Sequence, residues 1–262
     1  MKKFSLLLLL LSAMLIIAAC GSDEPAEETG GSGDGAAESK TYKVGIDTTY
    51  PPFEFEENGE YTGIDIDLIN AIAESQGFEI EFNPMDFGGI IPALQAGQLD
   101  VAIAGMSITD ERKNVVDFSD PYFDAGLSLV VAKDNNDITS LEDLEGKTVA
   151  VKSGTTGSKF AMDNESKYGY TVAQFEDSPS MFQEVSNGNA DVLLEDYPVI
   201  AYAIAESGLD LKTVGDRLTG DQYGIAVLKG ENADLLEKIN TGLQELRDSG
   251  EYDEILNKYI AE

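Results

Sequence analysis

The sequence predicts an α/β protein of two lobes, each a mostly parallel sheet flanked by helices, with two chain crossings between them. Strand-like apolar runs alternate with helical patterns along residues 41–262, as is typical of parallel sheets. The stretch 96–101 is similar to 187–192, which indicates two halves of one design. The strand and helices expected over 223–260 are left over in the second half, so we expect them to complete the first lobe.

The first lobe is expected to begin with a strand over 42–47, where apolar and polar residues alternate. A hairpin with its turn at 57–59 follows, and a helix over 65–76 then presents one apolar face and stops at Gly77. The next elements are a strand over 78–82, a short helix over 88–95 and a strand over 98–104.

The loop after that last strand contains small residues and an unusual arginine. Gly105 and Ser107 leave backbone N–H groups open, and Thr109 is expected to cap a helix with acids in its first turn. Arg112 falls in the same turn, where a cation opposes the helix dipole. We therefore expect Arg112 to hold an anion such as a carboxylate, although taken alone it also fits a solvated surface position.

The second lobe is expected to repeat this pattern from Gly126 onward. Its predicted strands cover 126–132, 148–151, 170–175 and 191–194. Its predicted helices cover 140–145, 178–186 and 196–205, and a further helix follows the loop 152–157 and runs to about 164. Helices over 232–260, interrupted at Gly250, end the chain. The predicted boundaries are 41–121 and 225–262 for the first lobe, 127–219 for the second, and 122–126 and 220–224 for a glycine-containing hinge.

The N-terminal residues are typical of a bacterial lipoprotein. Lysines precede an apolar run that ends near residue 19, which predicts a secretory signal peptide over 1–19. The residues before Cys20 resemble a lipobox, in which the cysteine is diacylated and becomes the N-terminus. Residues 20–40 then form the lipidated cysteine and a flexible Gly/Ser/acid-rich tether. We expect attachment to the outer face of the cell membrane through Cys20.

The composition excludes several function classes. The net charge of −32 repels phosphate backbones, so no nucleic-acid partner is expected. The sequence has no histidine and its one cysteine is Cys20, which removes His-dependent nucleophilic catalysis and the common zinc sites. The stretch 154–159 lacks the P-loop spacing, and 134–138 fails as a calcium loop. No cofactor and no metal are expected, and carboxylate-pair catalysis stays open.

Ligands of open α/β sheets lie at the carboxyl ends of the strands. The residues that follow the predicted strands supply acids, bases, open amides and aromatic faces: Asp47, Tyr50, Phe87, Gly105, Ser107, Arg112, Lys152, Thr155, Thr156, Glu195 and Asp196. Each one alone also fits a structural role, for example Tyr50 and Phe87 as core aromatics and Thr155 and Thr156 as helix caps. Together they suit a small zwitterion held between two facing lobes.

Several motifs resemble the family 3 solute-binding proteins of bacterial amino-acid ABC transporters. They occur in the family's order at 47–53, 63–68, 107–112 and 117–122, and the resemblance covers the chain after the tether. The segments 84–87, 149–155 and 222–226 resemble the glutamine-binding branch, and Gln222 is counted among its ligand-binding residues. The resemblance implies a periplasmic-binding-protein-like fold that closes on an amino acid and delivers it to a permease driven by an ATPase.

The resemblance also implies how the amino-acid backbone is held. Arg112 would bind the α-carboxylate together with backbone donors at Ser107 and Thr156. Asp196 and the carbonyl of Gly105 would accept from the α-ammonium.

The residues expected around the ligand side chain depart from the pattern of the family's glutamine binders at two positions. Tyr50 and Phe87 would sandwich the aliphatic stem, and Asp47 and Lys152 would bind the two ends of an amide, so glutamine is expected. Glutamine binders of the family can carry Phe in place of Tyr50 and His in place of Glu195. The extra carboxylate of Glu195 favours a cationic amino acid, arginine or lysine, while Lys152 opposes it, so both alternatives stay open.

Two other function classes fit the same fold. Some proteins of this fold are dehydratases that act on cyclic carboxylic acids, and Glu195 would then be a general acid. A sensory module that presents its ligand to a receptor is the other alternative. Arg112 with Asp196 fits an intact amino acid better, and no kinase or spanning segment is evident, so we expect a monomeric, non-enzymatic transport protein.

Overall fold

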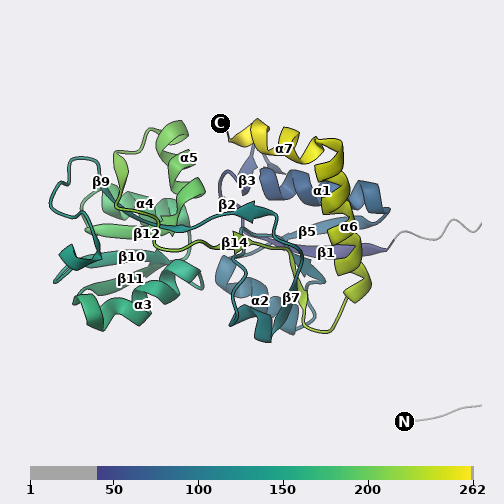
Figure 1. The fold of residues 1–262 in the computed structure, drawn as a ribbon, viewed down its shortest axis with the longest axis horizontal. Helices are drawn as coiled ribbons and strands as arrows, with labels where there is room; N and C mark the ends of the chain where they lie inside the picture. Colours follow the sequence, from purple (N-terminus) through teal and green to yellow (C-terminus); the bar gives the residue numbers. More distant parts are fainter. Residues whose placement is uncertain (1–39, 261–262) are drawn as a thin grey trace, which may run out of the picture. The chain divides into compact units, whose positions relative to one another are not determined.

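Two five-stranded sheets form the centres of two lobes in a computed structural model of the protein, which describes residues 40–260 (Figure 1). The strand order is β5-β1-β6-β15-β7 in the first sheet and β11-β10-β12-β9-β13 in the second. Each sheet has two parallel pairings followed by two antiparallel ones. The predicted two-lobed α/β fold is confirmed, with the correction that its sheets are mixed and not mostly parallel.

The strands that reach a lobe through a crossing explain this mixture. β9 (Leu127–Ala132) enters the second lobe after the crossing at 122–126, and β15 (Ala226–Leu228) returns to the first lobe after the crossing at 220–224. Each arrives from the edge where the parallel strands end, so it runs against them.

The first lobe contains most of the N-terminal half of the described chain together with its C-terminal helices. Helix α1 packs against α6 on one face of the sheet, and α2 covers the other face (Figure 1). Besides β15, its elements are β1 (Thr41–Ile46), β2 (Thr49–Tyr50), β3 (Glu54–Glu57), β4 (Glu60–Thr62), α1 (Ile64–Gln76), β5 (Glu79–Pro84), α2 (Phe87–Gln95), β6 (Val101–Ala102), η1 (Arg112–Asn114), β7 (Val116–Phe118), α6 (Ala233–Ser249) and α7 (Glu251–Tyr259). The last segment lies in this lobe, with β15 beside β6 in the sheet and α6 against α1.

The second lobe has helices α3 and α4 on opposite faces of its sheet (Figure 1). Thr155 caps α3 by accepting from the backbone N–H of Ser158 at 3.0 Å, and Asp177 caps α4 by accepting from that of Ser180 at 2.7 Å. Besides β9, its elements are η2 (Leu141–Asp143), β10 (Thr148–Lys152), α3 (Thr156–Tyr168), β11 (Thr171–Phe175), α4 (Ser178–Ser186), β12 (Val192–Asp196), α5 (Tyr197–Ser207) and β13 (Leu211–Val214).

The two crossings form a short two-stranded sheet of β8 (Phe123–Asp124) and β14 (Gln222–Tyr223). Aromatic rings cover it, with the Phe53 ring centroid 4.9 Å from that of Phe123 and 5.0 Å from that of Tyr223. Gly126 ends the first crossing at φ +144°, and a Cβ there would lie 2.6 Å from the carbonyl oxygen of Thr219. Only glycine fits this position.

Some predicted elements differ in length. The helix expected after Thr109 is a single 3-10 turn whose N-cap is Glu111 and not Thr109. Thr109 Oγ1 still accepts from the N–H of Arg112 at 3.1 Å. The strand expected over 98–104 is reduced to β6, and the one over 223–228 is broken at Gly224 into β14 and β15. Strands β7, β8 and β13 were not predicted, because two to four residues are too few to show alternation.

The described residues do not include the predicted signal peptide, the lipidated Cys20 or the tether up to residue 39. Within 40–260, no helix combines the length and apolar character needed to cross a bilayer.

Candidate functional site

One pocket lies where the carboxyl ends of strands from both lobes meet. Leu127, Gly157 and Leu194 line it together with ten of the predicted residues: Tyr50, Phe87, Gly105, Ser107, Arg112, Lys152, Thr155, Thr156, Glu195 and Asp196. The first five of these ten belong to the first lobe and the last five to the second. The predicted grouping of residues distant in sequence is therefore present in the structure.

Arg112 is a buried cation that meets only neutral acceptors. Its side chain donates to the carbonyl of Ser107 at 2.8 Å and to that of Gly154, in the other lobe, at 3.1 Å. Its guanidinium carbon lies 5.2 Å from the centroid of Phe87, and the residue is 8% exposed. Burial lowers the pKa of Arg112, and no described carboxylate lies within 4.0 Å of it. Such a guanidinium is able to receive a carboxylate through its remaining donors.

Asp196 is the buried acid on the opposite side. Its Oδ2 accepts from the hydroxyl of Tyr223 at 2.5 Å and from that of Tyr50 at 3.1 Å. Its Oδ1 is buried without a donor from the described residues. Burial raises the pKa of Asp196, and the two tyrosine hydrogen bonds counteract the rise. The free Oδ1 is an acceptor suited to an ammonium group.

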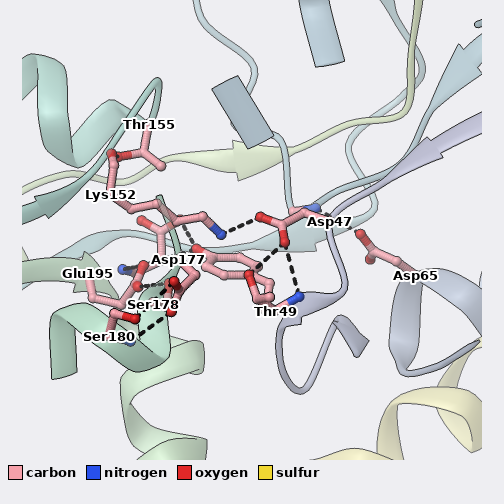
Figure 2. Close-up of polar contacts among 12 residues, drawn as sticks. Asp47, Thr49, Asp65, Lys152, Thr155, Asp177, Ser178, Ser180 and Glu195 are labelled. Atoms are coloured by element: carbon pink, nitrogen blue, oxygen red, sulfur yellow. Dashed lines mark hydrogen bonds and ion pairs between the residues drawn. The ribbon is translucent and has the colours of Figure 1, made fainter. Parts of the chain in front are cut away.

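Asp47 and Lys152 form a buried ion pair between the lobes. Their side chains point toward one another in Figure 2, and both are under 5% exposed. Thr49 supplies donors to the second oxygen of this carboxylate: its N–H donates to Asp47 Oδ1 at 3.0 Å, and its hydroxyl donates to the same oxygen at 2.7 Å. Lys152 Nζ lies 4.7 Å from the centroid of Tyr50. Asp47 thus reaches the pocket through Lys152 and is not itself part of the lining.

Glu195 is a third carboxyl group in the pocket. Its Oε1 accepts from the hydroxyl of Tyr50 at 3.1 Å and from the N–H of Asp196 at 2.9 Å. Its Oε2 accepts from the hydroxyl of Ser178 at 2.7 Å, and Figure 2 shows these two side chains together. Burial, with a smaller contribution from Asp196, raises the pKa of Glu195 to about 7. No cationic side chain of the described residues lies within 4.0 Å of this carboxyl group.

Backbone groups complete the lining. Helix α3 begins at the pocket, so the N–H groups of its first turn are available to an anion beside Arg112. Thr155 is the cap of this helix and also donates to the carbonyl of Lys152 at 2.7 Å, so the cap reading of Thr155 is confirmed. Gly105 has φ +52°, and a Cβ on it would lie 2.6 Å from Cε1 of Tyr50.

Gln222 is placed differently from the prediction. It is exposed on β14, does not line the pocket, and donates to Asp124 at 2.7 Å across the crossing. Its neighbour Tyr223 is buried and reaches Asp196, because side chains alternate between the two faces of a strand. Alternation along 222–226 could have identified Tyr223, whereas Leu127 and Leu194 carry no chemical signal in the sequence.

The enclosed space is small in this arrangement. The pocket holds about 10 Å³, which is room for about one water molecule. The hydroxyl of Tyr50, from the first lobe, reaches both acids of the second lobe. Tyr50 therefore links the two lobes at this pocket.

Comparisons with known proteins agree with this geometry. A "Probable histidine-binding protein" of Neisseria gonorrhoeae is 37% identical over 246 residues, which cover 88% of this chain and 89% of that protein. An ancestral arginine-binding protein was solved bound to arginine (48% identity, TM-score 0.79, 84% of this chain and 98% of that one) and bound to glutamine (49%, 0.78, 85% and 98%). An ancestral amino-acid-binding protein described as a precursor of cyclohexadienyl dehydratase is 43% identical with TM-score 0.76, and the match covers 84% of this chain and 95% of that one.

Other relatives are named for binding arginine, glutamine and cystine, so the glutamine branch is one of several that this chain resembles. The model of the bacterial extracellular solute-binding proteins, family 3, matches residues 42–262, and the chain belongs to this family of amino-acid-binding proteins of ABC transporters.

Proposed function

We propose that Arg112 and Asp196 bind the α-carboxylate and the α-ammonium of one amino acid between the two lobes. The observation that carries this proposal is a pair of buried, opposite charges whose hydrogen-bonding groups are not all used within the described residues. Arg112 meets only carbonyl oxygens, and Asp196 Oδ1 has no donor within the described residues. A buried charge is costly without a partner, and a zwitterion supplies both partners at once.

We further propose that the side chain of this amino acid is cationic, with arginine as the first candidate. Lys152 is already neutralised by Asp47, so it no longer opposes a positive ligand. With Asp196 assigned to the α-ammonium, Glu195 is the lining carboxyl group that has no cationic side chain of the described residues within 4.0 Å. Its proton leaves readily near neutral pH, and a guanidinium beside it would favour the ionised form. The solved arginine complex of a protein 48% identical to this chain supports the same choice.

Glutamine is the second candidate. The protonated form of Glu195 and the Asp47–Lys152 pair together present donors and acceptors for a side-chain amide. The same ancestral protein was also solved with glutamine. One pocket of this type thus accommodates either side chain, and affinity decides between them.

Delivery to the transporter would follow from closure of the lobes. Because the ligand contacts come from both lobes, binding shifts an equilibrium between open and closed forms, which a permease with its ATPase can recognise. We propose that the protein is held at the outer face of the membrane by a lipidated Cys20 after removal of residues 1–19.

The test is a thermal-shift panel of the twenty amino acids on the purified chain. A ligand at a hundred times its dissociation constant should add about 2.7 kcal/mol to the free energy of unfolding. Arginine should give the largest shift, with lysine or histidine next and glutamine weaker. A larger shift with glutamine than with arginine would move the assignment to the amide, and no shift with any amino acid would refute the proposal.

A dehydratase activity is the alternative that Glu195 itself favours. A carboxyl group with a pKa of about 7 is suited to general-acid catalysis, and a related ancestral protein is described as a precursor of such an enzyme. Arg112 opposite Asp196 fits an intact amino acid better than a cyclic acid without an amine. The two functions are distinguished by incubating the protein with a cyclic hydroxy-carboxylic acid. A dehydratase would eliminate water from it, and the unsaturated product would be detected by its absorbance.

A further inference from the structure

Two buried carboxyl groups lie directly beneath the pocket, and the ligand contacts described above do not use them. Glu54 of β3 and Asp65 of α1 are both fully buried. Both belong to the first lobe, and Asp65 is the first acid of the 63–68 motif. In Figure 2, Asp65 lies beyond Asp47 on the side away from Lys152.

The backbone brings these two acids together. The N–H of Ile64 donates to the carbonyl of Pro52 at 2.9 Å and that of Asp65 donates to the carbonyl of Phe53 at 2.8 Å, so the start of α1 is fixed against the segment before Glu54. Gly63 allows this contact, because a Cβ there would lie 2.2 Å from the carbonyl oxygen of Phe53. The glycine of the motif therefore has the role of bringing Asp65 against Glu54.

The pair lacks one donor if both acids are ionised. Both oxygens of Glu54 and Oδ1 of Asp65 are buried without a donor from the described residues. A hydrogen bond between the two carboxyl groups needs one proton, and such a bond raises the pKa of Glu54 and lowers that of Asp65. Two adjacent buried carboxylates would repel each other strongly, so a pair that holds one proton is the favoured form at neutral pH.

The ionised partner is connected to the binding site and to the hinge. Asp65 Oδ2 accepts from the N–H of Gly105 at 2.8 Å and from the hydroxyl of Tyr122 at 2.9 Å. Gly105 lines the pocket and is pressed against Tyr50. Tyr122 is buried at the start of the crossing, with its ring centroid 6.1 Å from that of Tyr223. One carboxylate thus fixes a pocket residue and a hinge residue at the same time.

We infer that Glu54 and Asp65 are positioning residues for the binding site, in which Glu54 retains the proton of the pair and Asp65 holds Gly105 and Tyr122 in the geometry that binds the ligand. The role of Gly105 in binding rests on the proposed function. The hydrogen bonds from Gly105 and Tyr122 to Asp65 are independent of the proposed function.

The pKa values agree with this distribution of the proton. Burial, followed by the charge of Asp65, raises the pKa of Glu54 well above its usual range, whereas burial raises the pKa of Asp65 only to about 6, because the hydrogen bonds from Glu54, Gly105 and Tyr122 favour its ionised form. The other charged and titratable groups that face the pair are Asp47 after β1, Lys152 of β10, and Tyr122 with Tyr223 behind it. Deprotonation of Glu54 at alkaline pH would place two carboxylates together and disturb Gly105.

The experiment combines binding with a readout that needs no ligand. Calorimetry with L-arginine and with L-glutamine at pH 7 should show a dissociation constant about tenfold or more higher for Asp65→Asn, which loses the charge that Gly105 and Tyr122 bind. Glu54→Gln should stay within about threefold of the parent, because its amide N–H replaces the shared proton. Asp67→Asn is the matched control, since Asp67 points away from the site and accepts from Lys258 at 2.7 Å and Tyr259 at 2.8 Å.

The second readout is the amide NMR signal of Gly105 in the ligand-free chain, followed from neutral pH upward over the range in which the chain stays folded. It should move with pH in the parent and in Asp67→Asn, and it should stay fixed in Glu54→Gln, because no proton is left to dissociate. An unmoving signal in the parent, or equal movement in Glu54→Gln, overturns the inference even if Asp65→Asn fails to fold. Failure of the proposed function is distinct from both, because it appears as absence of binding to the parent.

Discussion

The two lobes have the same strand order, and each lobe contributes one member to two pairs of buried, opposite charges. At the ends of the corresponding strands β1 and β10 stand Asp47 and Lys152. After β6 and at the end of β12 stand Arg112 and Asp196. The first pair is joined in a buried ion pair, whereas the second pair is not within 4.0 Å. One pair of charges therefore holds the lobes together, and we propose that the other is kept apart for the two ends of a ligand.

The largest effect is expected for the joined pair. Lys152→Met leaves Asp47 buried without its cation, which should destabilise the closed form by about 3–5 kcal/mol. Small-angle scattering of the ligand-free chain should then show a larger radius of gyration. The double variant Asp47→Asn/Lys152→Met removes both charges and should recover most of the compactness. If Lys152→Met alone is as compact as the parent, the ion pair does not hold the lobes together.

The separated pair should affect binding more than the ligand-free form, in which Arg112 contributes one hydrogen bond to the other lobe. Arg112→Ala removes the partner proposed for the α-carboxylate and should weaken amino-acid binding by about 2–5 kcal/mol, as when one member of a buried charge pair is lost. Titration calorimetry measures the change. Lys113→Ala is the matched control, because Lys113 is the adjacent cation and its side chain is 54% exposed. A dissociation constant of Arg112→Ala within threefold of the parent would show that Arg112 does not bind the ligand.

The smallest effect is a pH dependence from Glu195. The pKa of Glu195 is about 7 in the folded protein, compared with its ordinary value of 4.5. The free energy of unfolding should therefore fall as the pH rises from about 4.5 to about 7, because the unfolded chain releases this proton first. A cationic ligand needs the ionised form, so the affinity for arginine should be full above pH 7. Below pH 7 it should fall by at most about tenfold per unit. Glu195→Gln should remove this dependence. The affinity of the parent for glutamine should not rise with pH, because protonated Glu195 is the form proposed to face a side-chain amide. Equal pH profiles for the two amino acids would argue against the cationic assignment.

The sequence was most informative where charge and strand ends coincide. Arg112, Lys152 and Asp196 were identified because each follows a predicted strand, and the structure brings all three to one pocket. Gln222 and Tyr223 belong to the same motif, and only the alternation along 222–226 distinguishes the buried residue from the exposed one. Their difference depends on which face of a two-residue strand is buried.

The fold was predictable where patterns were long. Helices such as α1 and α4 span nine or more residues with a clear apolar face, and both were predicted within one residue or at their bounds. Glu54 lies in an acidic stretch that is typical of a surface hairpin, so nothing local indicated its burial. That burial is set by the contact of Gly63 with Phe53, which is a tertiary feature.

The phenol of Tyr50 occupies the two acids that are proposed to bind the ligand. In this structure it donates to Glu195 and Asp196, the two groups proposed to receive the positive charges of an amino acid. A ligand therefore gains only the difference between its own contacts and those it displaces. A diamine without a carboxylate would displace the phenol but leave Arg112 without an anion. In the proposed binding mode, the contacts of Tyr50 therefore favour complete amino acids over simple amines.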